Sequence, residues 1–148
     1  MNYTVQDVQD GVQDVHDWLM KIRYMDELID VKVAERERLM ALATKITPEM
    51  SGMPHGSGTS DKVGNIAVKL VDLARETNEL IDSMVDHKQK VLAVMQKLDS
   101  VEYLVLYKYY IQGMTLGQIA KDMHYHRVSI SNIKKKAMEH LKDATQFY

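Results

Sequence analysis

The stretch that decides the fold of the C-terminal third is residues 115–136, which read TLGQIAKDMHYHRVSISNIKKK. Thr115 is followed three residues later by glutamine, and this spacing lets each residue cap the other at the start of a helix. The pattern predicts a short helix from there to about Met123, a tight connection made by His-Tyr-His, and a last helix over 127–143. Two helices joined by a three-residue turn are typical of the helix-turn-helix motif.

The apolar positions of this stretch form one predicted buried face. Ala120 is small, as is needed where two helices cross closely. The side chains predicted to face the core are those of Ile119, Met123, Tyr125, Ile130 and Ile133. The side chains left pointing outward are those of His126, Arg127, Val128, Ser129, Ser131, Asn132, Lys135 and Lys136.

The outward-facing residues belong to the types that contact duplex DNA. Arginine and asparagine hydrogen-bond guanine and adenine edges, valine contacts the thymine methyl group, and lysine neutralises phosphate. We therefore predict contacts to base edges from Arg127, Ser131 and Asn132. The predicted contacts to the DNA backbone come from Lys121, Lys134, Lys135 and Lys136. A run of three lysines alone is typical of a solvated helix face, but its position after the motif favours phosphate contact.

Two further helices complete the organisation of the last fifty residues. Asp99 and Glu102 can form a reciprocal cap, which opens a predicted helix that ends at Gly113. Residues 99–148 are therefore predicted to fold as a small domain of three short helices. No segment of the chain shows the two-residue alternation of a β-strand, so we expect an all-α protein.

Long periodic segments precede this domain. Steps of three and four residues join Val63, Ile66, Leu70, Leu73, Thr77, Leu80, Met84, His87, Val91, Val94 and Leu98. The same spacing begins at the N-terminus with Val5, Val8, Val12, Val15, Leu19 and Ile22. Both prolines lie in the loop 47–60 between the two segments, and Ser60 can cap the second helix. We therefore predict a long antiparallel helical hairpin, a coiled-coil arm over 1–98, which pairs within one chain or with a second chain.

Composition excludes several classes of protein. The chain has 148 residues, a net charge of −2 and no cysteine, so disulfides and thiolate catalysis are excluded. No catalytic motif or cofactor loop occurs, and His124 and His126 lack a third metal ligand at a suitable spacing. We expect neither an enzyme nor a protein with a metal or other cofactor. No membrane-spanning or signal segment is recognisable, so a cytoplasmic location is expected.

Three stretches of the sequence resemble a known family. They are Asp99-Ser-Val-Glu102, Tyr109-Tyr110-Ile-Gln-Gly113-Met-Thr115-Leu-Gly-Gln-Ile119-Ala120, and residues 127–141. Together they resemble the region 4 domain of bacterial sigma factors. Nearly the whole chain, including the loop 51–65, resembles the small phage-encoded sigma-region-4-like proteins related to ArpU/RinA-type late-gene regulators. This sequence departs from the pattern at two positions, with His124 in place of the usual glycine and His126 in place of the usual serine or threonine cap.

The resemblance and the residues together predict a function. Between residues 126 and 142 there are five basic residues and one acidic residue, so the positive charge is local to the last helix. We expect a transcriptional regulator of phage or prophage origin that reads duplex DNA with the helix 127–142, and a homodimer formed through the arm. The resemblance also implies contact with RNA polymerase. The alternative is a coiled-coil adaptor that binds RNA polymerase or a phage protein without reading DNA.

Overall fold

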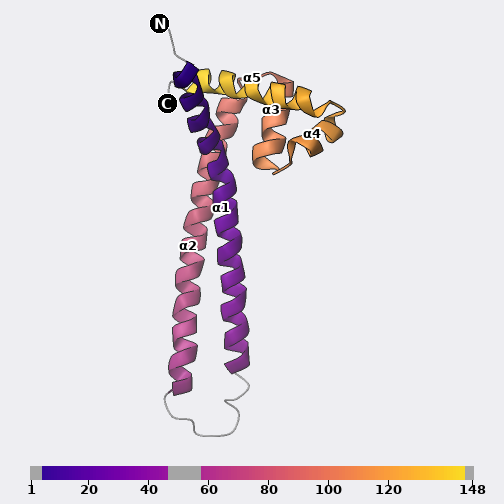
Figure 1. Ribbon diagram of the computed structural model, residues 1–148. Helices are drawn as coiled ribbons and strands as arrows, with labels where there is room; N and C mark the ends of the chain where they lie inside the picture. The colour runs from indigo at the N-terminus through magenta and orange to yellow at the C-terminus, as the bar shows by residue number, and fades with distance from the viewer. Residues whose placement is uncertain (1–4, 47–57, 146–148) are drawn as a thin grey trace. The chain divides into compact units, whose positions relative to one another are not determined.

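The part of the chain that the structure describes is built from helices. The computed structural model describes residues 5–46 and 58–145, and the side chains of residues 14–45 and 61–144. The elements in chain order are α1 (Val5–Ile46), α2 (Gly58–Met95), α3 (Ser100–Leu106), η2 (Tyr107–Ile111), α4 (Leu116–Met123) and α5 (Arg127–Thr145) (Figure 1). No strand occurs within these two ranges, and the predicted all-α fold, with long helices followed by a small helix-turn-helix domain, is confirmed. No helix in the described ranges is apolar over a length that could cross a membrane.

Helix α2 begins slightly before its predicted start. Its first residue is Gly58, so the last three residues of the predicted loop 47–60 are helical. Residues 47–57 lie outside the described residues, as does the side chain of Ser60, the predicted cap. Asp61 lies in the first turn of α2, where the positive end of the helix dipole favours its carboxylate.

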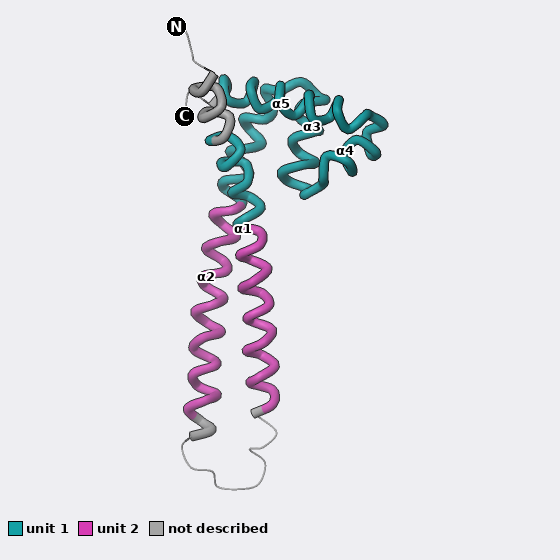
Figure 2. Tube along the Cα trace, in the orientation of Figure 1, with its two compact units in different colours: residues 1–24, 85–148 teal, residues 25–84 magenta. Residues whose placement is uncertain are grey.

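The chain forms two compact units (Figure 2). Unit 1 contains residues 1–24 and 85–148, and unit 2 contains residues 25–84. The boundaries of these units differ from the predicted domain boundary between residues 98 and 99. The division of the chain into domains 1–98 and 99–148 stays a prediction. Unit 1 is therefore discontinuous in sequence, because the start of α1 and the end of α2 pack with the C-terminal helices.

The main core of unit 1 brings together five elements, α1, α2, α3, η2 and α5. Its buried apolar side chains are Val15, Leu19 and Ile22 from α1, Val91, Val94 and Met95 from α2, Leu106 and Tyr110, and Ala137, Met138 and Leu141 from α5. Burial of apolar surface on this scale is the main favourable contribution to folding. The last helix is thus packed along its C-terminal half against the two long helices.

A polar contact lies among the apolar residues that join α1 to α2. The buried His87 donates from Nε2 to the Trp18 carbonyl at 2.7 Å, and the two rings meet edge to face with centroids 5.6 Å apart. A buried imidazole without a partner would be costly, so this bond favours one register between the two helices.

Unit 2 consists of the remaining parts of α1 and α2. Lys32 on α1 and Glu76 on α2 form an ion pair of 2.8 Å, which identifies the two segments as antiparallel neighbours. Within residues 25–45 and 61–84, Leu39 is the one apolar side chain below a tenth exposed. The other apolar side chains along the seam, such as Ile29, Leu70 and Leu73, are half-buried.

A π-helical turn interrupts the helix predicted over 99–113. Residues 107–111 adopt this wider turn, with the Gln112 amide bonded to the Tyr107 carbonyl at 3.1 Å. The helix predicted to end at Gly113 therefore closes with a π-helical turn at Ile111, and Gly113 adopts the left-handed conformation with φ 71°. Tyrosines surround this turn, and Tyr110 is fully buried while Tyr109 packs against both apolar clusters of unit 1. Such turns change the direction of successive side chains, which lets neighbouring tyrosines enter different clusters.

Candidate nucleic-acid interface

The first helix of the motif begins at the predicted cap. The Thr115 hydroxyl accepts from the Gln118 amide at 3.2 Å, and the Gln118 side chain accepts from the Thr115 amide at 2.9 Å. Both halves of the capping box are present, so the start of α4 is satisfied by its own side chains.

The predicted three-residue connection leads directly from α4 into α5. His124 adopts the left-handed conformation, with φ 60° and ψ 40°, and its amide donates to the Ala120 carbonyl. The Tyr125 amide donates to the same carbonyl at 2.9 Å, and the Ile130 amide donates to the His126 carbonyl at 3.1 Å in the first turn of α5. Both amides of the turn therefore donate to one carbonyl near the end of α4, that of Ala120, and the His126 carbonyl accepts the bond that starts the hydrogen bonding of α5.

We expect His124→Gly to stabilise the protein. A non-glycine residue in the left-handed region carries a penalty of about 1 kcal/mol or more, which glycine removes at the cost of some chain entropy. The free energy of unfolding should rise by up to about 1 kcal/mol in urea titrations followed by helical circular dichroism. His124→Ala keeps the penalty and is the control; a destabilised glycine variant would show that the imidazole makes contacts that outweigh the strain.

A small apolar cluster fixes the crossing of α4 and α5. Its buried members are Val105, Ile119, Ala120 and Ile130, and Met114, Leu116, Met123 and Ile133 pack against it. This agrees with the predicted inward face, except for one residue. Tyr125 is 44% exposed, so the prediction that its ring lies behind the turn was wrong. The cluster is complete without the Tyr125 ring, and the phenol hydroxyl of Tyr125 can bond to water at the surface.

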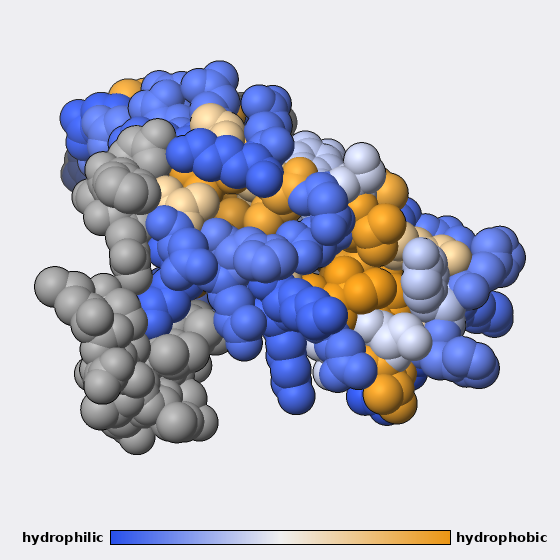
Figure 3. Space-filling model, turned by 90° about the horizontal axis from the view of Figure 1, so that it is seen from above, coloured by the Kyte–Doolittle hydropathy of each residue, from blue (hydrophilic) through white to orange (hydrophobic). Residues whose placement is uncertain are grey.

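Most of the predicted contact residues lie on the surface. The exposed ones are Lys121, His126, Arg127, Val128, Asn132, Lys135 and Lys136, and Ser129 and Ser131 are half-buried. Val128, at the second position of α5, is 71% exposed. Seen from above, hydrophilic residues cover most of the visible face and hydrophobic residues gather between them (Figure 3). The first turns of α5 thus present hydrogen-bonding, basic and apolar side chains to solvent.

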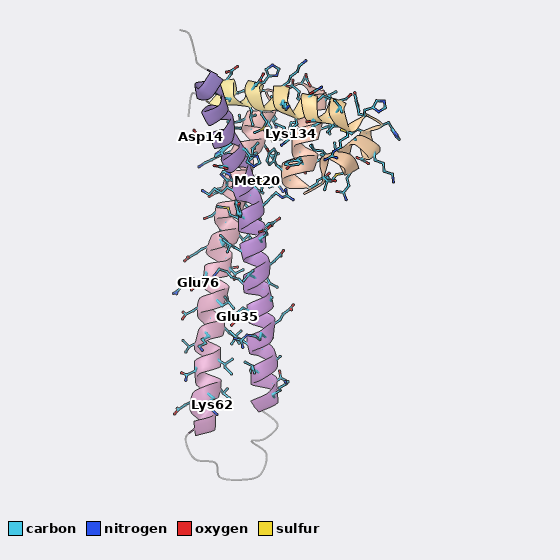
Figure 4. All side chains as sticks on the ribbon, viewed as in Figure 1. Asp14, Met20, Glu35, Lys62, Glu76 and Lys134 are labelled. Carbon is cyan, nitrogen blue, oxygen red and sulfur yellow. The ribbon has the colours of Figure 1, made fainter. Side chains whose placement is uncertain are left out.

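Lys134 differs from the other predicted phosphate contacts (Figure 4). Its ammonium lies 4.2 Å from the centre of the Tyr109 ring and 5.6 Å from that of Tyr110. Burial lowers the pKa of this lysine. The cation is therefore placed on the aromatic side of α5, where cation–π attraction stabilises it. Sequence spacing does not reveal this contact, because the aromatic partners come from another element.

An ion pair missed by the sequence analysis lies beside the motif. Lys108 and Asp122 are 2.6 Å apart, and this lysine lowers the pKa of the Asp122 carboxyl by hydrogen bonding and by its charge. Asp122 lies on α4, one residue from Lys121. The pair neutralises an acidic group on the helix that precedes α5.

A second missed pair connects α3 to α5. The Asp99 carboxylate caps α3 as predicted, accepting from the Glu102 amide at 2.8 Å. The reciprocal half of the predicted cap is not made, because the buried Glu102 carboxylate accepts from His140 Nδ1 at 2.9 Å instead. The sequence separation of 38 residues is the reason local spacing could not identify this partner.

The Glu102–His140 pair should make stability depend on pH. The hydrogen bond and charge of Glu102 raise the pKa of His140 above 6.5. A raised pKa means that the stabilisation is complete below the unfolded value and is lost as pH rises through the folded value. Wild type should therefore exceed His140→Gln in free energy of unfolding by more at about pH 5.5 than at about pH 8. An equal difference at both pH values would contradict this, and an NMR titration of the His140 ring gives its pKa directly.

Helix α1 contacts η2 and α5 inside unit 1. His16 Nδ1 and the Tyr110 hydroxyl are 2.7 Å apart, and the same hydroxyl donates to Met138 Sδ at 3.8 Å. Burial raises the pKa of Tyr110, and burial with the charge of Lys134 lowers the pKa of His16. Arg23 lies 5.9 Å from the centre of the Tyr109 ring. The π-helical tyrosines thus add polar and cation–π contacts with both α1 and α5.

Comparisons with known proteins agree with this geometry. Residues 94–143 match the family model described as sigma-70, region 4. The chain is also 27% identical over 124 residues to RNA polymerase sigma factor SigO of Bacillus subtilis (strain 168), covering 82% of this chain and 67% of that protein. No solved structure is significantly similar to the chain. These similarities support a DNA-binding helix-turn-helix protein of the sigma region 4 type.

Proposed function

We propose that this protein is a transcriptional regulator of phage or prophage origin that binds duplex DNA with the exposed face of α5. The observation that carries the proposal is the complete motif: a capped α4, a three-residue turn, and an α5 whose first turns expose Arg127, Val128 and Asn132. A helix of this kind fits the major groove of B-DNA with its N-terminal residues toward the bases. The similarity of residues 94–143 to sigma-70 region 4 supports the same conclusion.

The exposed residues divide by the contact each would make. Arg127, Ser131 and Asn132 would contact base edges, and Val128 a thymine methyl group. Lys121, Lys135 and Lys136 would contact phosphates, which position the protein without specifying sequence. Lys134 would not contact the DNA backbone. It would stabilise the packing of α5 through its cation–π contact with Tyr109.

Partners of the regulator are part of the proposal. The relative from Bacillus subtilis is named an RNA polymerase sigma factor, and this supports contact of the present chain with RNA polymerase. A single small reader binds weakly, so we also propose a homodimer formed through the helical arm. The regulator would act in the cytoplasm, without catalytic activity, metal or other cofactor.

Selection from a random-sequence duplex library, followed by mobility shifts of the full chain, tests DNA binding. The three proposed phosphate contacts predict that affinity falls by roughly 40-fold between about 50 and 200 mM salt. Failure to enrich any sequence, or binding that salt does not weaken, would overturn the proposal.

A second candidate function is favoured by the apolar side chains that unit 2 exposes. Leu28, Val31, Met40 and Val71 are each more than a third exposed, which is typical of surfaces that bind other proteins. An adaptor of this kind would bind a protein through its arm and no duplex through its domain. The selection experiment separates the two functions, because the adaptor enriches no DNA sequence.

A further inference from the structure

Unit 2 exposes a row of small and apolar side chains that faces away from the seam between its helices. Its members recur on α2 at steps of four and three residues, and we call them the outer stripe: Ala67, Val71, Ala74, Asn78 and Ile81. All five are exposed, Val71 to 70%. This spacing is the heptad spacing of a coiled-coil seam, and it adds a second seam beside the one that faces α1.

The seam within the chain does not satisfy the apolar content of unit 2. Leu39 is the one buried apolar side chain among residues 25–45 and 61–84, while Leu28, Val33 and Val68 are also more than a third exposed. Two helices alone form a single layer, whereas stable helical structures bury each apolar face against a further element. A further layer of helices against the outer stripe would supply that element.

Charge is divided sharply along unit 2. Residues 25–30 and 76–84 contain six acidic residues and no lysine or arginine. Residues 31–45 and 61–75 contain seven basic and four acidic residues. The Lys32–Glu76 pair, and the influence of Lys69 on the pKa of Glu35, show that the paired helices are in this register. Unit 2 therefore has an acidic half and a basic half, and the boundary lies near Glu76.

From these observations we infer that two copies of this chain pair through the outer stripe in opposite directions. Opposite directions place the acidic half of one copy against the basic half of the other, whereas parallel pairing places like charges together. A two-fold axis near residue 76 sets Val71 opposite Ile81 of the second copy and Ala74 opposite Asn78 of the second copy. Small side chains thus face larger ones, which allows close helix packing.

This inference deepens the proposed homodimer and rests on it, but it does not rest on DNA binding. The arm would pair in this way whether or not α5 reads a duplex. The dimer should also weaken as salt is raised, because its orientation depends on exposed opposite charges.

Sedimentation of the full chain with one added charge tests the face. Val71→Glu buries one unpaired charge against Ile81 of the second copy at each of the two equivalent sites, so the dimer dissociation constant should rise by about 100-fold or more. The matched control is Val31→Glu, which adds the same charge at an α1 side chain that is 65% exposed and outside the outer stripe. The control should change the constant by less than about threefold. Equal effects of the two variants would overturn the assignment of the face.

Disulfide trapping tests the direction. The chain has no cysteine, so introduced thiols report on single positions. Bridged residues need Cα atoms within about 7 Å, so mixed Val71→Cys and Ile81→Cys chains should cross-link while neither variant links to itself. A disulfide between two Val71→Cys chains would show parallel pairing. That result would overturn the proposed antiparallel direction but not the proposed dimer. If the wild-type protein stays monomeric at all concentrations, the proposed dimer and its direction are both overturned. If the protein dimerises but the mixture of Val71→Cys and Ile81→Cys chains does not cross-link, the proposed register is overturned.

Discussion

Replacing Arg127, Lys135 and Lys136 together with glutamine should lower the affinity for a selected duplex by roughly 100-fold or more. The three side chains are exposed on α5, so their loss removes contacts without removing buried packing. An arginine on a guanine edge contributes about 1–3 kcal/mol, and each lysine on a phosphate contributes about one unit to the slope of affinity against salt. The variant should therefore bind more weakly and respond less to salt, as fluorescence anisotropy across a salt series would measure.

A matched control separates this effect from net charge. Lys21, Lys90 and Lys97 are exposed and lie outside residues 99–148, and their replacement with glutamine removes the same total charge. This control should keep affinity within about threefold of wild type, because none of the three lysines lies on α4 or α5. If both triple variants lose affinity equally, the interaction is an unspecific attraction and α5 is not the reading helix. Arg127→Gln alone should relax sequence preference, whereas Lys135→Gln alone should weaken all sequences alike.

Tyr110→Ala should lower the free energy of unfolding by about 3–5 kcal/mol. The ring is fully buried among side chains of α1, α2 and α5, so its truncation leaves a cavity in the core. The surrounding side chains belong to different helices, and these helices cannot all move inward to fill the cavity. It also removes the partner of His16 and one of the two rings near Lys134. Urea titration followed by helical circular dichroism would measure the loss.

The conservative replacement distinguishes packing from hydrogen bonding. Tyr110→Phe keeps the ring and should lose only about 1–2 kcal/mol, because His16 Nδ1 is left without its partner at 2.7 Å. Equal losses in both variants would mean that the hydroxyl, and not the ring, provides the stabilisation. An alanine variant as stable as wild type would contradict the assignment of Tyr110 to the core.

Local pattern was sufficient to predict the elements of the fold. The spacing of Val91 and Val94 reflects a helix that buries one face, and Thr115 with Gln118 caps α4 with side chains three residues apart. These features depend on residues that are close together in sequence, so they can be predicted from a single sequence. Most of the predicted surface of α5 is exposed for the same reason, since helix periodicity separates its inner and outer faces.

The features that sequence could not predict depend on partners far along the chain. Lys134 has the same local setting as Lys135, and only the tyrosines of η2 distinguish them. His140 pairs with Glu102 across 38 residues, and His16 meets Tyr110 across 94. Spacing within one helix contains no information on such pairs, and the π-helical turn that positions the tyrosines depends on both clusters being packed at once.

The discontinuity of unit 1 has a consequence for synthesis on the ribosome. Val15, Leu19 and Ile22 leave the exit tunnel before Ala137, Met138 and Leu141, which share their core and begin 115 residues after Ile22. Contacts of such long sequence separation form late and slowly. These side chains of α1 therefore lack their α5 partners until α5 has emerged, and limited proteolysis of stalled nascent chains would reveal that interval.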